Sequence, residues 1–273
     1  MAELKECVLV DGVRTANCRA HAAKGWFRTL RPDELLTYVY KALFERNPQV
    51  KPEEVEAVFC GTANQTGMQN DIARLGWLVS GLPESVPTNG INQQCPSAMA
   101  AIEHAARAIM SGEGDIYIAS GVEDMQNVSM GMGMDFPPRI ADYYNPADLP
   151  MGPTAEKTAE KSGITREDTE LLAYHSHIRA RDARDAGKFK DEIVPIKGLD
   201  DNGQEFVVDR DQWIRDNPDL EQMAQMKPAF KPDGLVTAAT SSPLTTGAAA
   251  ILFMARDKAD ELGLSYRLKY GGG

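Results

Sequence analysis

The sequence has few cysteines and no long apolar run, and each shortage excludes a class of protein. Four cysteines in 273 residues are too few for a disulfide framework, so we expect a reducing, cytoplasmic compartment. The most apolar run, 248–255, is far shorter than the ~20 residues of a membrane-spanning helix. We therefore expect no membrane partner.

Basic residues are also scarce relative to acidic ones. The chain has 29 Lys and Arg against 40 Asp and Glu, which gives a net charge of −11. This balance argues against nucleic acid or an anionic membrane as the main partner. A composition of 42% hydrophobic and 25% charged residues is typical of a globular protein. An anionic small ligand would therefore need a local group of positive charges.

Strand-like and helix-like segments alternate along the chain, which predicts an α/β fold with a sheet covered by helices. The expected strands are 7–13, 55–60, 88–92, 115–119, 192–196, 235–240, 248–255 and 266–270. The expected helices include 32–46, 71–79, 97–111, 167–185 and 256–262.

Methionines, glycines and prolines interrupt this pattern after Gly121, where we expect a long loop over 121–145. We predict an α/β core from residues 1–120 and 232–263, and an inserted loop domain from residues 121–231, because loops of this length usually cover or serve a site. Residues 264–273 are expected to begin a further half.

Cys95 has the strongest chemical context in the sequence. It follows a predicted strand and stands directly before Pro96, a residue suited to the start of a helix. The first-turn amides and the helix dipole favour a thiolate there, which would make Cys95 a nucleophile. Most free cysteines are small buried side chains, and that alternative remains open from spacing alone.

A nucleophilic cysteine needs a base, and no histidine is an evident partner for Cys95. His104 lies more than two turns into the same predicted helix, and His21 lies in an early loop. His175 and His177 are two residues apart on a helix and face different directions, which makes a poor metal pair. We expect no metal site.

The segments around Cys95 resemble those of the thiolase family. The stretch 92–102 and the following 119–125, ASGVEDM, are similar to the family's nucleophile segment and its A-G-G-V-E-S-M-like motif. Further matches follow in the same order along the chain at 13–15 (VRT), 151–156 (MGPTAE), 176–177 (SH), 187–193 (GKFKDEI), 227–230 (KPAF), 234–239 (GLVTAA) and 247–250 (GAAA).

The resemblance implies an acyltransferase that joins or cleaves acyl chains on coenzyme A, with no metal or redox cofactor. Cys95 would accept the acyl group as a thioester, and its backbone amide would be one oxyanion donor. Ser242 would contact the pantetheine arm, Arg215 the nucleotide end of coenzyme A, and Met151 and Ala238 would line the pantetheine tunnel. The family also implies at least a homodimer.

Six residues depart from the family pattern. Pro96 and Ala98 stand where the family usually has glycines, Ser120 replaces the first glycine of A-G-G, and Thr240 replaces the asparagine of an N-A-S-like motif. An asparagine-aspartate pair before the closing glycine is replaced by threonines. These differences indicate a specialised substrate or weakened activity.

The family's N-E-A-F, G-H-P and C-x-G-like motifs, which belong to its second half, do not occur in this sequence. The resemblance therefore covers the nucleophile-bearing half, and catalysis would need a C-terminal half, supplied by another chain or by the rest of a longer protein. The alternatives are a non-catalytic acyl-CoA-binding or partner-scaffolding subunit, and decarboxylative condensation as in ketoacyl synthases, against which the 151–156 motif speaks.

Overall fold

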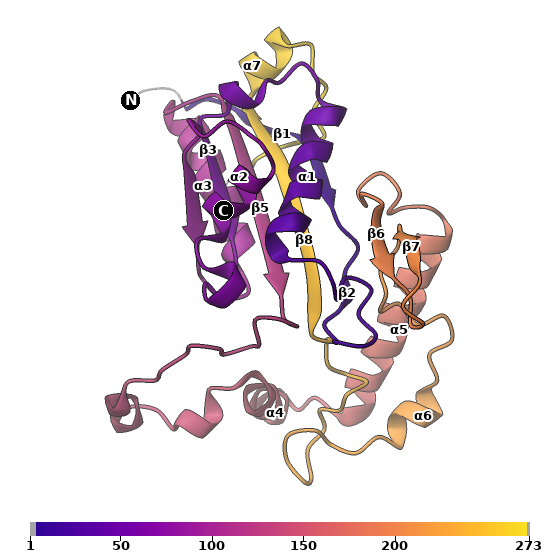
Figure 1. The fold of residues 1–273 in the computed structure, drawn as a ribbon. Helices are drawn as coiled ribbons and strands as arrows, with labels where there is room; N and C mark the ends of the chain where they lie inside the picture. Colours follow the sequence, from indigo (N-terminus) through magenta and orange to yellow (C-terminus); the bar gives the residue numbers. More distant parts are fainter. Residues whose placement is uncertain (1–3, 272–273) are drawn as a thin grey trace. The chain divides into compact units, whose positions relative to one another are not determined.

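A computed structural model describes residues 4–271 (Figure 1). The last two residues of the predicted segment 264–273 lie outside the described residues. The described chain clusters into two compact units: unit 1 contains residues up to 132, 189–212 and the residues from 244 onward, and unit 2 contains 133–188 and 213–243. The α/β core and the inserted loop domain stay predictions.

Unit 1 is built on a mixed sheet whose strands lie in the order β4-β3-β5-β8-β1-β9, with β2 also paired to β8. The strands are β1 (Cys7–Arg14), β2 (Cys18–Arg19), β3 (Ala57–Gly61), β4 (Thr88–Ile91), β5 (Ile116–Asp124), β8 (Thr245–Ala255) and β9 (Leu268–Lys269). β3 is parallel to β4 and β5, whereas β8 is antiparallel to both β5 and β1. The α/β fold with a helix-covered sheet is thus confirmed.

Helices cover both faces of this sheet. They are α1 (Pro32–Arg46), α2 (Ile72–Val79), α3 (Ser97–Ser111) and α7 (Arg256–Glu261), with single 3-10 turns at Pro52–Glu54 and Gly67–Gln69. Side chains alternate across a strand: Ile116 and Ile118 of β5 join the hydrophobic cluster of α1 and α2, while Tyr117 and Ala119 join that of α3. Figure 1 shows α1 running along β8.

Three strand predictions are wrong in part or whole. The strand expected over 115–119 extends to Asp124 as β5, because its backbone stays paired with β8. Residues 192–196 are not a strand; Ile193 makes one isolated bridge to Arg14, and a hairpin of β6 (Ile196–Leu199) and β7 (Glu205–Val208) follows. Residues 235–240 form turns in which only Thr237 bridges, to Pro228.

Arg14 joins the segment 189–212 to the rest of unit 1. Arg14 Nε lies 2.8 Å from Glu192 Oε1, and Arg14 Nη1 lies 2.7 Å from Asp211 Oδ1. The central guanidinium carbon, Cζ, lies 5.6 Å from the ring centre of Phe189. Two carboxylates and an aromatic face surround a guanidinium whose side chain is only 20% exposed. The arginine of the 13–15 motif is therefore a structural anchor.

Unit 2 is mainly helical. It contains α4 (Met151–Ser162), α5 (Arg166–Asp185) and α6 (Leu220–Ala224), with 3-10 turns at Pro138–Asp142 and Pro146–Asp148. Thr165 caps α5 by accepting from the Asp168 amide. No helix within residues 4–271 combines the length and apolar character that crossing a membrane requires.

Candidate active site

Cys95 lies in the turn between β4 and α3, and its exposure separates it from the other cysteines. Cys7, Cys18 and Cys60 are buried, whereas Cys95 is exposed. Burial raises the pKa of Cys7 to about 12 and that of Cys60 to about 11, and it also raises the pKa of Cys18. Cys95 is therefore the accessible thiol of the chain, and the buried-cysteine alternative does not apply to it.

The backbone of the Cys95 turn has an uncommon shape. Gln94 has a φ of 58°, in the left-handed region that non-glycine residues seldom occupy. Its amide donates to Asn92 Oδ1 at 3.0 Å, and its carbonyl accepts from the Ser97 amide at 3.0 Å. Pro96 is the N-cap residue of α3, and the helix begins at Ser97 as predicted.

The beginning of α3 packs directly on two glycines of the sheet. A Cβ placed on Gly61 would lie 2.3 Å from the Ala98 amide nitrogen, and one on Gly121 would lie 2.7 Å from Ala98 Cβ. Both glycines therefore allow the helix to approach the neighbouring strands β3 and β5. Ala98, where the family usually has a glycine, occupies the space that Gly121 leaves open.

The Cys95 backbone amide has no hydrogen-bond acceptor among residues 4–271. It lies next to the N-terminus of a fifteen-residue helix, where unpaired amides and the helix dipole favour negative charge. An exposed thiol and an unpaired N–H thus belong to the same residue. This arrangement can form a thioester and donate to an oxyanion.

The histidines make contacts that do not involve Cys95. His104 stacks on Phe59 with ring centres 5.6 Å apart, and His21 Nδ1 accepts from the amides of Ala23 and Lys24. In unit 2, His177 Nδ1 accepts from the Arg215 amide at 3.2 Å. Burial, and then the charge of Arg215, lower the pKa of His177.

The four predicted coenzyme A contacts all lie in unit 2. Met151 is the first residue of α4, and Arg215 lies in the loop that precedes α6. Ala238 and Ser242 lie in the irregular segment before β8. All four are exposed. Cys95 belongs to unit 1, so the predicted nucleophile and the predicted coenzyme A contacts lie in different units.

Glu156 holds the segment that carries Ala238 and Ser242. It is only 3% exposed, and its two carboxylate oxygens accept from the amides of Leu235 and Val236, both at 3.0 Å. Thr240 Oγ1 accepts from the Thr237 amide at 3.0 Å, so this replacement of the family's asparagine still fixes the turn. The motif at 151–156 was recognised in the sequence, but this role of its glutamate was not.

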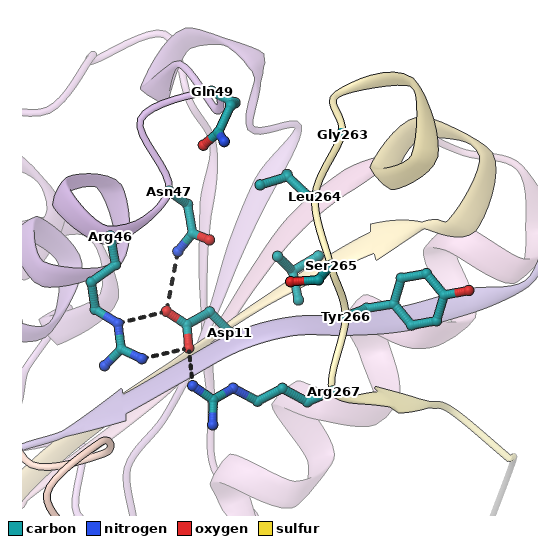
Figure 2. A pocket seen from close by; sticks show the side chains of 10 residues that line it. Asp11, Arg46, Asn47, Gln49, Gly263, Leu264, Ser265, Tyr266 and Arg267 are labelled. Carbon is teal, nitrogen blue, oxygen red and sulfur yellow. Dashed lines mark hydrogen bonds and ion pairs between the residues drawn. The ribbon is translucent and has the colours of Figure 1, made fainter.

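Unit 1 has a second polar site in a hollow of about 450 Å³ beside β1 (Figure 2). Asp11, 5% exposed, lies at its centre and pairs with Arg46 Nε at 2.8 Å and Arg267 at 3.2 Å. Asn47 and the Gly12 amide also donate to its carboxylate. These contacts fasten residues 263–267 and the end of α1 to β1.

Comparisons with known proteins agree with the fold. A family model described as "Thiolase, N-terminal domain" matches residues 7–257. The 3-ketoacyl-CoA thiolase of Marinobacter nauticus is 43% identical over 263 residues, covering 96% of this chain and 67% of that protein. That of Idiomarina loihiensis is 42% identical over 268 residues, covering 97% and 69%.

Solved structures agree as well. The acetyl-CoA acetyltransferase of Bacillus anthracis superposes with a TM-score of 0.84 at 31% identity, covering 97% of this chain and 69% of that one. The acetyl-CoA acetyltransferase of Syntrophomonas wolfei gives a TM-score of 0.83 at 33% identity, with 98% and 69% covered. The chain therefore belongs to the thiolase family and carries its N-terminal domain.

Proposed function

We propose that Cys95 is the nucleophile of a thiolase-type acyl transfer. The observation that carries this proposal is the exposed thiol beside an unpaired backbone amide, in a chain whose other described thiols are buried. The names of the relatives, 3-ketoacyl-CoA thiolase and acetyl-CoA acetyltransferase, support the same substrate class. The chemistry needs no metal or redox cofactor.

The proposed thiolysis has two steps. The Cys95 thiolate attacks the 3-oxo carbon of a 3-oxoacyl-CoA, a bond from sulfur to carbon forms, and the neighbouring carbon–carbon bond breaks. The electron pair of that bond stays on C2, the carbon next to the thioester, and this carbon takes up a proton to give acetyl-CoA. The thiolate of a second coenzyme A then attacks the thioester, releases Cys95 and carries away the shortened acyl chain; the reverse sequence is condensation.

The coenzyme A contacts remain part of the proposal. Arg215 would contribute positive charge near the nucleotide end, and Ser242, Met151 and Ala238 would border the pantetheine arm. Their exposure leaves them accessible to a ligand, and Glu156 holds the backbone at Leu235 and Val236, just before Ala238. A local arginine suits a phosphate-bearing ligand in a chain of net charge −11.

The base would come from outside these 273 residues. The resemblance implies that a C-terminal half supplies it, together with a second oxyanion donor, either from another chain or from the rest of a longer protein. Assembly into a homodimer or a larger oligomer is part of the same proposal.

Intact-mass spectrometry tests the nucleophile. The chain is incubated with acetyl-CoA or acetoacetyl-CoA, alone and with a candidate C-terminal half, and the modified residue is located by peptide mapping. We expect one acetyl group on Cys95, none on Cys95→Ala, and unchanged labelling of Cys7→Ala, which removes a buried thiol. Thiolysis should appear when the C-terminal half is present.

Equal acetylation of Cys95→Ala, or labelling at another residue, would refute the proposal. If the chain binds acyl-CoA but no partner restores labelling or turnover, it is a non-catalytic acyl-CoA-binding subunit. Equilibrium dialysis with acetyl-CoA separates that outcome from loss of binding.

A further inference from the structure

Gln94, immediately before Cys95, is held in a backbone conformation that its side chain does not favour. Only Asp71 and Gln94 among the non-glycine residues of the described chain have a positive φ. Aspartate tolerates this region through local hydrogen bonds, whereas glutamine has no such advantage. Such a conformation persists only where neighbouring groups enforce it.

Two side chains enforce it in this turn. Asn92 Oδ1 accepts from the Gln94 amide at 3.0 Å. Ser97 Oγ accepts from the Gln93 amide at 2.9 Å and donates to the Gln94 carbonyl. The peptide groups on both sides of the strained residue are therefore fixed by side chains that lie within five positions of each other.

Ser97 is buried, with 2% of its surface exposed, and its hydroxyl uses both its donor and an acceptor position within the turn. An alanine would fit the same space but would leave the Gln93 amide without that acceptor. The Gln94 carbonyl would also lose the hydroxyl donor that, with the Ser97 amide and Asn92, opposes a return of Gln94 to a negative φ. Because Cys95 follows directly, its thiol and amide would turn with it.

We propose that Ser97 and Asn92 are positioning residues that act through Gln94 and hold the Cys95 thiol and amide where the acyl group is received. This inference rests on the function proposed above for Cys95. Neither side chain touches the reacting atoms. Their effect is to keep the strained turn in one conformation before substrate arrives.

The test measures how far Ser97→Ala lowers the rate of Cys95 acetylation and whether a second substitution restores that rate. Acetylation of Cys95 by acetyl-CoA, in the presence of the candidate C-terminal half, is followed by intact mass for the wild type, Ser97→Ala, Ser97→Thr, Gln94→Gly and the double variant Gln94→Gly/Ser97→Ala. We expect Ser97→Ala to slow acetylation at least ~10-fold, which corresponds to ~1.4 kcal/mol in the barrier. Ser97→Thr, which keeps the hydroxyl, should retain most of the rate.

The double variant distinguishes positioning from packing. Glycine adopts a positive φ without strain, so Gln94→Gly should recover most of the rate lost in Ser97→Ala. Ser111→Ala is the matched control, because Ser111 Oγ donates to a backbone carbonyl at the other end of α3; its rate should equal that of the wild type. Asn92→Ala changes an exposed residue and should slow acetylation without affecting folding.

Wild-type acetylation rates in both Ser97→Ala and Asn92→Ala would overturn the inference. So would a double variant Gln94→Gly/Ser97→Ala that is as slow as Ser97→Ala alone. Alkylation of Cys95 by iodoacetamide in the same variants keeps this result separate from the proposed function. We expect alkylation of Cys95 to be slower in Ser97→Ala and Asn92→Ala than in the wild type, and to recover in the double variant. If no protein is acetylated but the alkylation rates follow this order, the positioning role holds and the acyl transfer fails. If the alkylation rates are all equal, the positioning role fails.

Discussion

The Cys95 turn and the Asp11 site on β1 are both polar groups of unit 1, but their contacts are organised in opposite ways. Around Asp11, two guanidiniums, one amide side chain and one backbone amide converge on a single buried carboxylate (Figure 2). Around Cys95, neutral side chains hold a strained residue, and a thiol and an N–H are left without partners.

The difference separates the turn proposed to carry the nucleophile from the other polar site of unit 1. The charged site carries the stronger individual interactions, yet its groups satisfy one another and fasten elements together. The turn contains no charged side chain, but strain and unpaired groups coincide there. Strain without evident structural benefit is a better indication of function here than charge is.

The largest expected contrast is in thiol reactivity, between Cys95 and Cys7 at the start of β1. Iodoacetamide at neutral pH should label Cys95 first in the folded chain, with peptide mapping as the readout. Cys7, with a pKa of about 12, would have roughly one thiolate in 10⁵ molecules at pH 7, and burial also blocks the reagent. Below that pKa its thiolate fraction grows about tenfold per pH unit, so the raised pKa keeps Cys7 a thiol at neutral pH. Equal labelling of both cysteines at neutral pH would contradict this comparison.

A second contrast concerns glycines in the two regions. Gly61→Ala places a methyl group against the backbone of Ser97 and Ala98, and we expect a loss of about 3 kcal/mol in the free energy of unfolding, with slower Cys95 labelling. In Gly12→Ala, beside Asp11, the methyl group would meet Ile251 at an ordinary 3.5 Å. That variant should change stability by less than about 1 kcal/mol. Urea denaturation measures both, and similar losses would show that the packing of α3 on β3 is not special.

Removing the charge of Asp11 should lower stability but leave Cys95 reactivity unchanged. Asp11→Asn breaks the pairs with Arg46 and Arg267, and we expect a loss of about 1–3 kcal/mol. The arginine side chains are 35% and 53% exposed, so water can replace part of the interaction. Asp201→Asn, at an exposed loop position, is the control and should be neutral. A changed Cys95 alkylation rate in Asp11→Asn would mean that the two sites are coupled.

The smallest expected effect concerns Ala98, a departure from the family pattern. Gly121→Ala should cost about 1–2 kcal/mol, because the two methyl groups would lie 2.7 Å apart. In the Ala98→Gly background that cost should largely disappear, which a double-mutant cycle in urea measures. Additive losses in the double variant would show that Ala98 does not limit the space at Gly121.

The helices that bear the site could be predicted because their signals are local. Pro32 begins α1, and α3 extends over its predicted range Ser97–Ser111, since proline before or at the first turn and a regular apolar face are both visible in sequence. The exposure of Cys95 did not follow from the same pattern, because most free cysteines are buried and spacing alone left that alternative open. The confirmed family assignment came from motifs in a conserved order along the chain.

The remaining features depend on residues far apart in sequence. Gly121 reads as a strand end, yet it continues β5 because pairing with β8 outweighs its local preference and α3 needs the space. Residues 235–240 look like a strand, but Glu156 accepts two of their amides and turns take the place of a ladder. The strain at Gln94 has no sequence signal, because it arises from the contacts of Asn92 and Ser97.

The contacts of Arg14 with the 189–212 segment limit how this protein can be shortened. A shortened chain that joined residue 132 directly to residue 244 would keep every strand of the main sheet but discard Glu192 and Asp211. It would leave a largely buried guanidinium without counter-ions, a costly defect in an otherwise intact sheet. A minimal domain for crystallisation or labelling must therefore carry the 189–212 segment as a third piece.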